Sequence, residues 1–155
     1  MVIDAVQELQ EITAPADMAI KAADQRWAMY ALPGTADLLA GHTLLHTDLA
    51  PHNVLVDNRA HLVDWAWPTR GAARIDPAVL ILRLLEAGHL LTSADSIARQ
   101  FPSWRNAPGP AVQAFTTANA AAWAEIARAD SALWKAAMGR HATAFETWAK
   151  TFPAR

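Results

Sequence analysis

Residues 44–65 read LLHTDLAPHNVLVDNRAHLVDW, and this stretch decides the fold that the rest of the chain can support. Two short β-type runs, Val54–Val56 and His61–Val63, flank the sequence DNRA, whose composition is typical of a turn. The stretch therefore predicts a β-hairpin over 54–56 and 61–63. Because Pro51 cannot continue a regular element, residues 45–53 are predicted to form a loop that leads into the hairpin.

The polar residues of this loop follow the spacing H-x-D-x-x-x-x-N, and a further aspartate lies eleven residues after the asparagine. Phosphoryl transfer to a hydroxyl needs a carboxylate that orients the hydroxyl and accepts its proton, and oxygen ligands that hold Mg²⁺ against the phosphates. Asp48 suits the first role, and Asn53 with Asp64 suits the second. Because antiparallel strands return the chain to its starting edge, the hairpin is expected to bring Asn53 and Asp64 together. The predicted cofactor is Mg²⁺ with ATP or GTP.

Protein kinases carry the same order, H-R-D-x-x-x-x-N followed by a metal-binding aspartate. Here Thr47 replaces the arginine, and the later aspartate is followed by tryptophan. Together with the segments VDW at 63–65 and DPA at 76–78, the loop resembles the aminoglycoside-phosphotransferase family of small-molecule kinases. The resemblance covers residues 44 to about 85 and implies a phosphotransferase that moves the γ-phosphate of ATP or GTP to a hydroxyl of a small molecule.

The resemblance also implies a role for individual residues. Asp48 resembles the catalytic aspartate, Asn53 and Asp64 resemble the magnesium ligands, and His46 and Asp76 resemble the residues that support the loop. Residues that bind the nucleotide stay unassigned. The family usually has glycine where this chain has Thr47, so a positive φ at this position would strain the threonine.

The sequence on both sides of the loop is mostly helical in pattern. Helices are predicted over 2–12, 16–31, 35–39, 78–87 and 92–100, followed by two long amphipathic helices around 112–126 and 134–148. Asp76 and Pro77 form a strong helix start, with the aspartate as N-cap, and the helix after them is apolar nearly all round, which predicts the most buried element. The predicted fold class is α+β, mostly α: a protein-kinase-like C-terminal lobe with one hairpin and a helical bundle. It forms a single domain over 1–155, with the catalytic loop at 45–53 and a helical subdomain at 76–151.

A complete kinase of this type also needs a glycine-rich strand–turn–strand over the phosphates and a lysine that pairs with them. None of the six glycines forms G-x-G-x-x-G, and the single lysine before the loop, Lys21, lies in a predicted helix. The nucleotide-binding lobe is therefore predicted to be absent, and the chain alone to have little or no activity. An uncovered apolar surface on the first two helices or the hairpin is expected to mediate dimerisation or to bind a separate lobe.

Composition excludes several other classes of protein. The chain has 155 residues, 53% of them apolar, a net charge of -2 and no cysteine, which excludes a disordered tail and a disulfide scaffold. The charge predicts neither nucleic-acid nor membrane partners, and the sequence predicts a cytoplasmic protein without a signal peptide. Carboxylates on the last helices, at Glu125, Asp130 and Glu146, are too sparse for a polycation, so the acceptor is predicted only to be a small hydroxyl-bearing molecule.

Two alternatives remain open beside the phosphotransferase. The first is a pseudokinase-like module that keeps the fold to bind a small molecule, a metal or a partner without catalysis. The second is a metal-dependent hydrolase in which His42, His46, Asp48 and His52 hold zinc, although Pro51 and the mixed spacing do not place these residues on one helical face. ATP turnover distinguishes the first alternative, and a preference for Zn²⁺ over Mg²⁺ distinguishes the second.

Overall fold

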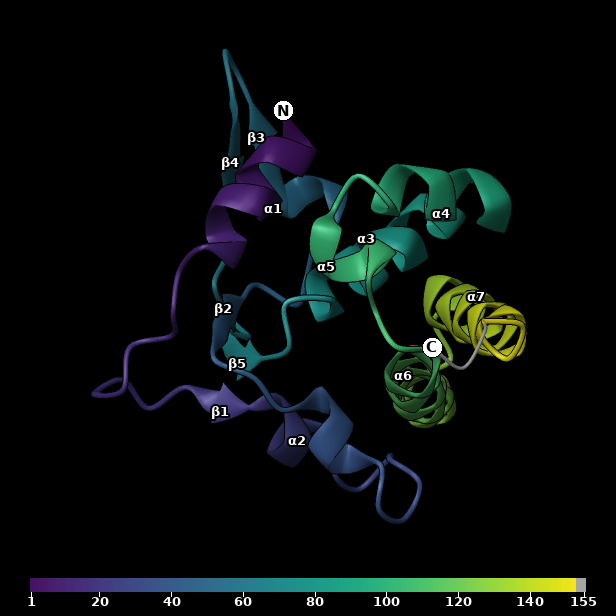
Figure 1. Cartoon of the computed structure of the whole chain (residues 1–155). Helices are drawn as coiled ribbons and strands as arrows, with labels where there is room; N and C mark the ends of the chain where they lie inside the picture. The colour runs from purple at the N-terminus through teal and green to yellow at the C-terminus, as the bar shows by residue number, and fades with distance from the viewer. Residues whose placement is uncertain (153–155) are drawn as a thin grey trace.

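A computed structural model describes residues 1–152, so the last three residues of the predicted domain lie outside the described part. Within this range the chain has an α+β fold, mostly helical, as the sequence predicts (Figure 1). The α-helices are α1 (Val2–Gln10), α2 (Ala23–Arg26), α3 (Ile75–Glu86), α4 (Leu91–Ala98), α5 (Pro102–Arg105), α6 (Gly109–Ala129) and α7 (Leu133–Ala149). The strands are β1 (Lys21–Ala22), β2 (Thr43–Leu45), β3 (Val54–Val56), β4 (Ala60–Leu62) and β5 (Thr69–Gly71), and two 3₁₀-helices are η1 (Ala36–Leu39) and η2 (Pro51–Asn53).

The predicted hairpin is present as the antiparallel pair β3–β4, with Val54 opposite Leu62 and Val56 opposite Ala60. Its second strand begins one residue earlier than predicted, because the turn is shorter. The Asp57 carboxylate accepts the backbone N–H of Arg59 at 2.9 Å, which closes the turn before Ala60. The hairpin stands beside α1 at one edge of the molecule (Figure 1), and it exposes Leu55 and Val56 to solvent.

A second, three-stranded sheet was not predicted. Its strand order is β1-β5-β2, with β1 parallel and β2 antiparallel to β5. The sheet takes up part of the helix predicted over 16–31, of which only Ala23–Arg26 is helical, so that prediction was wrong. Trp27, just after α2, is 8% exposed and packs edge-on against Phe115 of α6 at a ring-centroid distance of 5.3 Å. Tertiary packing therefore holds this segment where the local pattern predicted a helix.

Helix α3 forms the centre of the core, and nine of its twelve residues are buried. It is the most buried helix, as predicted, and α4, α5 and α7 all contact it. It begins at Ile75 with Arg74 as N-cap residue, so the prediction that Asp76 caps this helix was wrong. The Asp76 carboxylate instead reaches the loop that β2 leads into.

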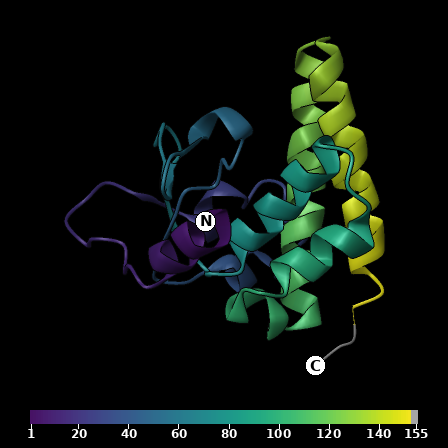
Figure 2. The ribbon, with the colours of Figure 1, turned by 90° about the horizontal axis from the view of Figure 1, so that it is seen from above.

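Helices α6 and α7 are the two predicted long helices, and they lie side by side along most of their length (Figure 2). Phe145 and Met138 of α7 are fully buried, whereas Trp134 at the start of the same helix is 53% exposed. Trp104 of α5 is in the core, where its indole N–H donates to Asp95 at 2.9 Å. None of the helices within residues 1–152 has the length and apolar character needed to cross a bilayer.

Candidate active site

The loop at 45–53 is anchored by one buried carboxylate. Asp76 is fully buried, and its two oxygens accept the backbone N–H groups of His46 and Thr47, each at 2.9 Å. Each oxygen therefore has its own donor, and the carboxylate fixes two consecutive peptide groups at the start of the loop. Because Asp76 lies in the first turn of α3, this contact couples the loop to the core helix.

His46 links the loop to the hairpin. Its ring is fully buried, with Nε2 2.9 Å from the carbonyl oxygen of Val63 and Nδ1 3.3 Å from the backbone nitrogen of Asp48. Nδ1 accepts a hydrogen bond from the Asp48 N–H, so Nε2 carries the proton and donates to Val63. Trp65 packs edge-on over the ring at 4.6 Å and shields it. Both nitrogens are engaged, so His46 acts on the position of the loop and not as a proton carrier.

Asn53 ties the end of the loop back to Asp48. Its side chain is 1% exposed, and its amide NH₂ donates to the Asp48 carbonyl at 3.1 Å. The Asn53 carbonyl accepts the backbone N–H of Val63 at 3.0 Å, so the hairpin returns the chain to this point and Asp64 follows directly. Asp64 is exposed and has φ 58°, a left-handed conformation that turns the chain sharply out of the hairpin.

Thr47 also has a left-handed conformation, with φ 64°. This position therefore has the positive φ that glycine adopts without strain, and the β-branched side chain is strained there. The hydroxyl offsets part of the strain by donating to the Trp67 carbonyl at 2.7 Å. Thr47 thereby connects the loop to the segment that follows the hairpin.

We expect Thr47→Gly to be more stable than Thr47→Ala by about 0.5–1 kcal/mol, the reverse of the usual preference for alanine. Both variants lose the bond to Trp67, but only glycine adopts φ 64° without strain. Urea unfolding of both proteins measures the difference. A more stable alanine variant would contradict the strain assigned to this residue.

Burial raises the pKa of the Asp76 carboxyl, and the N–H groups of His46 and Thr47 and the proximity of His46 partly oppose the shift. Since the folded pKa lies above the unfolded one, the contribution of Asp76 to stability is full at acidic pH and declines as pH rises through the raised value. Asparagine does not titrate and supplies one acceptor instead of two, so Asp76→Asn should cost about 1–3 kcal/mol. We expect this deficit to be largest at acidic pH and to shrink as the pH rises through the raised pKa, in urea unfolding of both proteins. A deficit that grows with pH would contradict the raised pKa.

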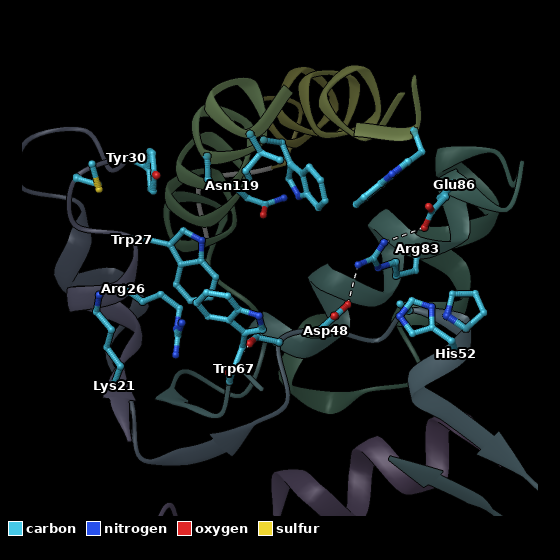
Figure 3. Close-up of a pocket in the computed structure, with 18 residues that line it drawn as sticks. Lys21, Arg26, Trp27, Tyr30, Asp48, His52, Trp67, Arg83, Glu86 and Asn119 are labelled. Atoms are coloured by element: carbon cyan, nitrogen blue, oxygen red, sulfur yellow. Dashed lines mark hydrogen bonds and ion pairs between the residues drawn. The ribbon is translucent and has the colours of Figure 1, made fainter. Parts of the chain in front are cut away.

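Asp48 lies on a cleft of about 710 Å³ between the loop, the segment around α2 and helices α6 and α7 (Figure 3). Its side chain is 31% exposed, and Oδ1 accepts a hydrogen bond from the Arg83 guanidinium at 2.7 Å. Arg83 also binds Glu86 at 2.9 Å. Within residues 1–152 Asp48 Oδ2 has no hydrogen-bond donor, so it is the oxygen that can accept a proton from a ligand. The cleft lining includes Asp48 and neither Asn53 nor Asp64.

Sequence analysis missed Arg83 as a site residue. It occurs in the helix predicted to be apolar nearly all round, and a lone arginine in such a helix, three residues before Glu86, is a signal that could have identified it. It also missed the wall of the cleft on α6, where Asn119 and Trp123 line it. Their helical spacing gives no indication that this face opens onto the loop.

Asn53 and Asp64 offer oxygen atoms, the type of donor that magnesium prefers. The Asn53 amide oxygen is not used in its bond to Asp48, since the NH₂ is the donor, and the Asp64 carboxylate is exposed one residue beyond the Asn53–Val63 bond. Amide and carboxylate oxygens are ligands that Mg²⁺ accepts when phosphates complete its shell. Among the described residues no group of three or more His, Cys, Asp or Glu side chains is placed to hold a metal, so the zinc arrangement of His42, His46, Asp48 and His52 is not formed.

Comparison of the chain with protein-family models, with curated proteins and with solved structures returned no match.

Proposed function

We propose that this chain is the catalytic-loop lobe of a small-molecule kinase of the aminoglycoside-phosphotransferase type. In the proposed reaction an acceptor hydroxyl oxygen bonds to the γ-phosphorus as the bond from that phosphorus to the β-phosphate oxygen breaks. The hydroxyl proton passes to Asp48, and the nucleoside diphosphate leaves. The supporting observation is that Asp48 lies at a cleft with one carboxylate oxygen bound by Arg83 and the other open.

The loop around Asp48 supports this role because it is pre-organised. Bonds from Asp76, His46 and Asn53 fix the backbone on both sides of Asp48 before any ligand binds. Phosphoryl transfer relies mainly on positioning and on charge, so a rigid base is worth more than a mobile one. Asn53 and Asp64 are the residues that would hold Mg²⁺, which supplies charge neutralisation of the phosphates when bound. They lie outside the cleft lining, which leaves the cleft for the acceptor.

Transfer of radiolabelled γ-phosphate from Mg²⁺-ATP to a panel of hydroxyl compounds tests the proposal. These 155 residues contain no glycine-rich phosphate loop, so the chain alone should bind Mg²⁺-ATP weakly and transfer little phosphate. A separately produced nucleotide-binding lobe should raise the rate by about 10²-fold or more, since a clamp on the phosphates contributes several kcal/mol. EDTA should abolish the gain. Absence of transfer to every acceptor, with and without the lobe, would contradict the proposal.

A second candidate is a binding module without catalysis, favoured by the ion pair between Asp48 and Arg83. The guanidinium already occupies Oδ1 of the carboxylate and fixes the side chain at the edge of the cleft, an arrangement that suits a binding group. In this case the cleft binds its ligand, but no phosphate is transferred in the presence of the added lobe. Ligand binding without turnover thus distinguishes this candidate from the kinase.

A further inference from the structure

The cleft beside Asp48 has an unusually aromatic lining for a surface that is open to water. Five aromatic side chains border it: Trp27, Tyr30, Trp67, Trp123 and Trp134. Trp67 is 59% exposed and Trp134 is 53% exposed. Large aromatic surfaces left in water at a concave site are typical of a site that a ligand covers, since covering them is favourable.

These rings are held in fixed orientations by their neighbours. Trp134 of α7 meets Trp123 of α6 edge-on at 6.2 Å, and Trp67 carries the Arg26 guanidinium over its ring at 5.2 Å. Aromatic rings favour stacked and edge-on contacts with other rings, and a rigid ligand loses little conformational freedom when it binds. A cleft lined by these side chains therefore suits a flat, rigid ligand.

The charges of the cleft are distributed unevenly across it. Its two acidic lining residues, Asp48 and Glu86, both bind Arg83 on one side. Lys21 and Arg26 lie on the other side of Trp67 (Figure 3), and neither forms a salt bridge in the part of the chain that is described. The Arg26 guanidinium donates to the Pro68 carbonyl at 3.1 Å, and its buried Nε atom has no hydrogen-bond partner. Lys21 and Arg26 thus leave positive charge uncompensated at this end of the cleft.

One carboxylate near the rim has to be weighed against this charge. Burial and the nearby Glu125 carboxylate of α6 raise the pKa of the Tyr30 phenol. Glu125 is exposed and is not part of the lining, so water screens it more than it screens charges inside the cleft. A ligand in the cleft would therefore meet more positive than negative charge.

On the basis of the proposed function, we propose that the acceptor is a hydroxyl compound with a flat aromatic ring system and a carboxylate at the opposite end. Its hydroxyl lies at Asp48, its rings lie among Trp67, Trp123 and Trp134, and its carboxylate meets Lys21 and Arg26. This assignment separates the chain from kinases that act on polycations, for which the free charges of this cleft have the wrong sign.

Binding of three matched probes tests the assignment without any requirement for turnover. The probes share the 6-(hydroxymethyl)naphthalene body and differ at position 2, which carries a carboxylate, a carboxamide or an aminomethyl group. Dissociation constants from ligand-observed NMR titration of the chain should rank carboxylate, carboxamide and amine, with about tenfold or more between the first and the last. 4-(Hydroxymethyl)cyclohexanecarboxylate carries the same two groups on a ring that lacks an aromatic face. It should bind at least about fivefold more weakly than the naphthoate.

Variants assign the preference to residues. Lys21→Gln and Arg26→Gln should each reduce the advantage of the carboxylate probe by about threefold or more, whereas Arg70→Gln should leave it unchanged. Arg70 is the matched control because it is exposed on β5, next to β1 in the same sheet, and does not line the cleft. Trp134→Leu should weaken all three probes by about tenfold, whereas Leu133→Ala, next to it and 86% exposed, should weaken none.

Several outcomes would overturn the assignment: equal affinity for the three probes, tightest binding of the amine, no binding of any probe, or displacement of the naphthoate by ATP, which would make the cleft a nucleotide site. Failure of the proposed function looks different. In that case the carboxylate probe binds with the expected preference, but no phosphate reaches its hydroxyl when the nucleotide-binding lobe is added. Conversely, transfer to other acceptors without binding of the naphthoate would retain the kinase and reject this acceptor class.

Discussion

Asp48→Asn is expected to lower phosphate transfer by about 10³-fold, measured with the added nucleotide-binding lobe at saturating Mg²⁺-ATP. Asparagine keeps the size of the side chain and an oxygen for Arg83, but it cannot take up the proton of the acceptor hydroxyl. The bonds that hold the loop involve the backbone of residue 48 and not its carboxylate, so they persist in the variant. The loss should therefore appear in kcat, whereas acceptor binding should change by no more than about twofold.

Asp57→Asn is the matched control for this variant. Asp57 is an exposed aspartate in the hairpin turn, and asparagine can replace it as the acceptor for the Arg59 N–H. The rate of phosphate transfer by the Asp57→Asn variant should equal that of the unchanged chain. If transfer survives in Asp48→Asn, another residue is the base and the assignment of the loop to catalysis is wrong.

The second large effect concerns folding. Gly41 lies against β5, and a Cβ atom at this position would be 2.4 Å from the Gly71 carbonyl oxygen and 2.6 Å from the Ala72 nitrogen. Both are backbone atoms, so β5 itself would have to move. We expect Gly41→Ala to lower the free energy of unfolding by about 3 kcal/mol or more. Since β2 leads directly from this point to His46, the variant should also disturb the loop.

Gly139→Ala provides the comparison within the same chain. Gly139 is in the middle of α7, where an added Cβ would meet its nearest neighbours at 3.7 and 3.8 Å, an ordinary contact distance. This substitution should raise the free energy of unfolding by about 0.5–1 kcal/mol, because alanine favours the helix. Urea unfolding of both variants measures the two effects, which should have opposite signs. Equal effects would show that the close approach at Gly41 is not a constraint.

The elements that sequence analysis identified are those with strong local signals. The hairpin has β-branched flanks around a turn whose aspartate closes it, and α3, α6 and α7 are long enough for their patterns to be unambiguous. The three-stranded sheet has no comparable signal, because its strands have two or three residues each. The pairing of Lys21 with Thr69 also joins segments that are far apart in the chain. The periodicity of apolar residues within one segment cannot reveal the pairing of strands that are distant in the sequence.

The site was partly accessible from the sequence for a similar reason. The spacing from His46 to Asn53 predicts the loop, and the resemblance predicts Asp76 as a support for it, in agreement with its bonds to His46 and Thr47. The sequence did not indicate that Arg83 binds Asp48, because the contact depends on how α3 passes beneath the loop. Nor did it distinguish the tryptophans of the core from those of the cleft. Trp104 is 1% exposed and Trp134 is 53% exposed, although both lie in helices.

The two sides of the cleft come from different elements of the fold. The loop with Asp48 is fixed by α3 and the hairpin, whereas Asn119, Trp123 and Trp134 belong to the pair α6–α7. For the proposed kinase, substitutions along the open face of that pair would alter the compound that is accepted and leave the loop with Asp48 intact. Natural selection acting on such an enzyme would diversify its substrates at constant chemistry, and a mutant library restricted to this helical face is the corresponding route for the laboratory.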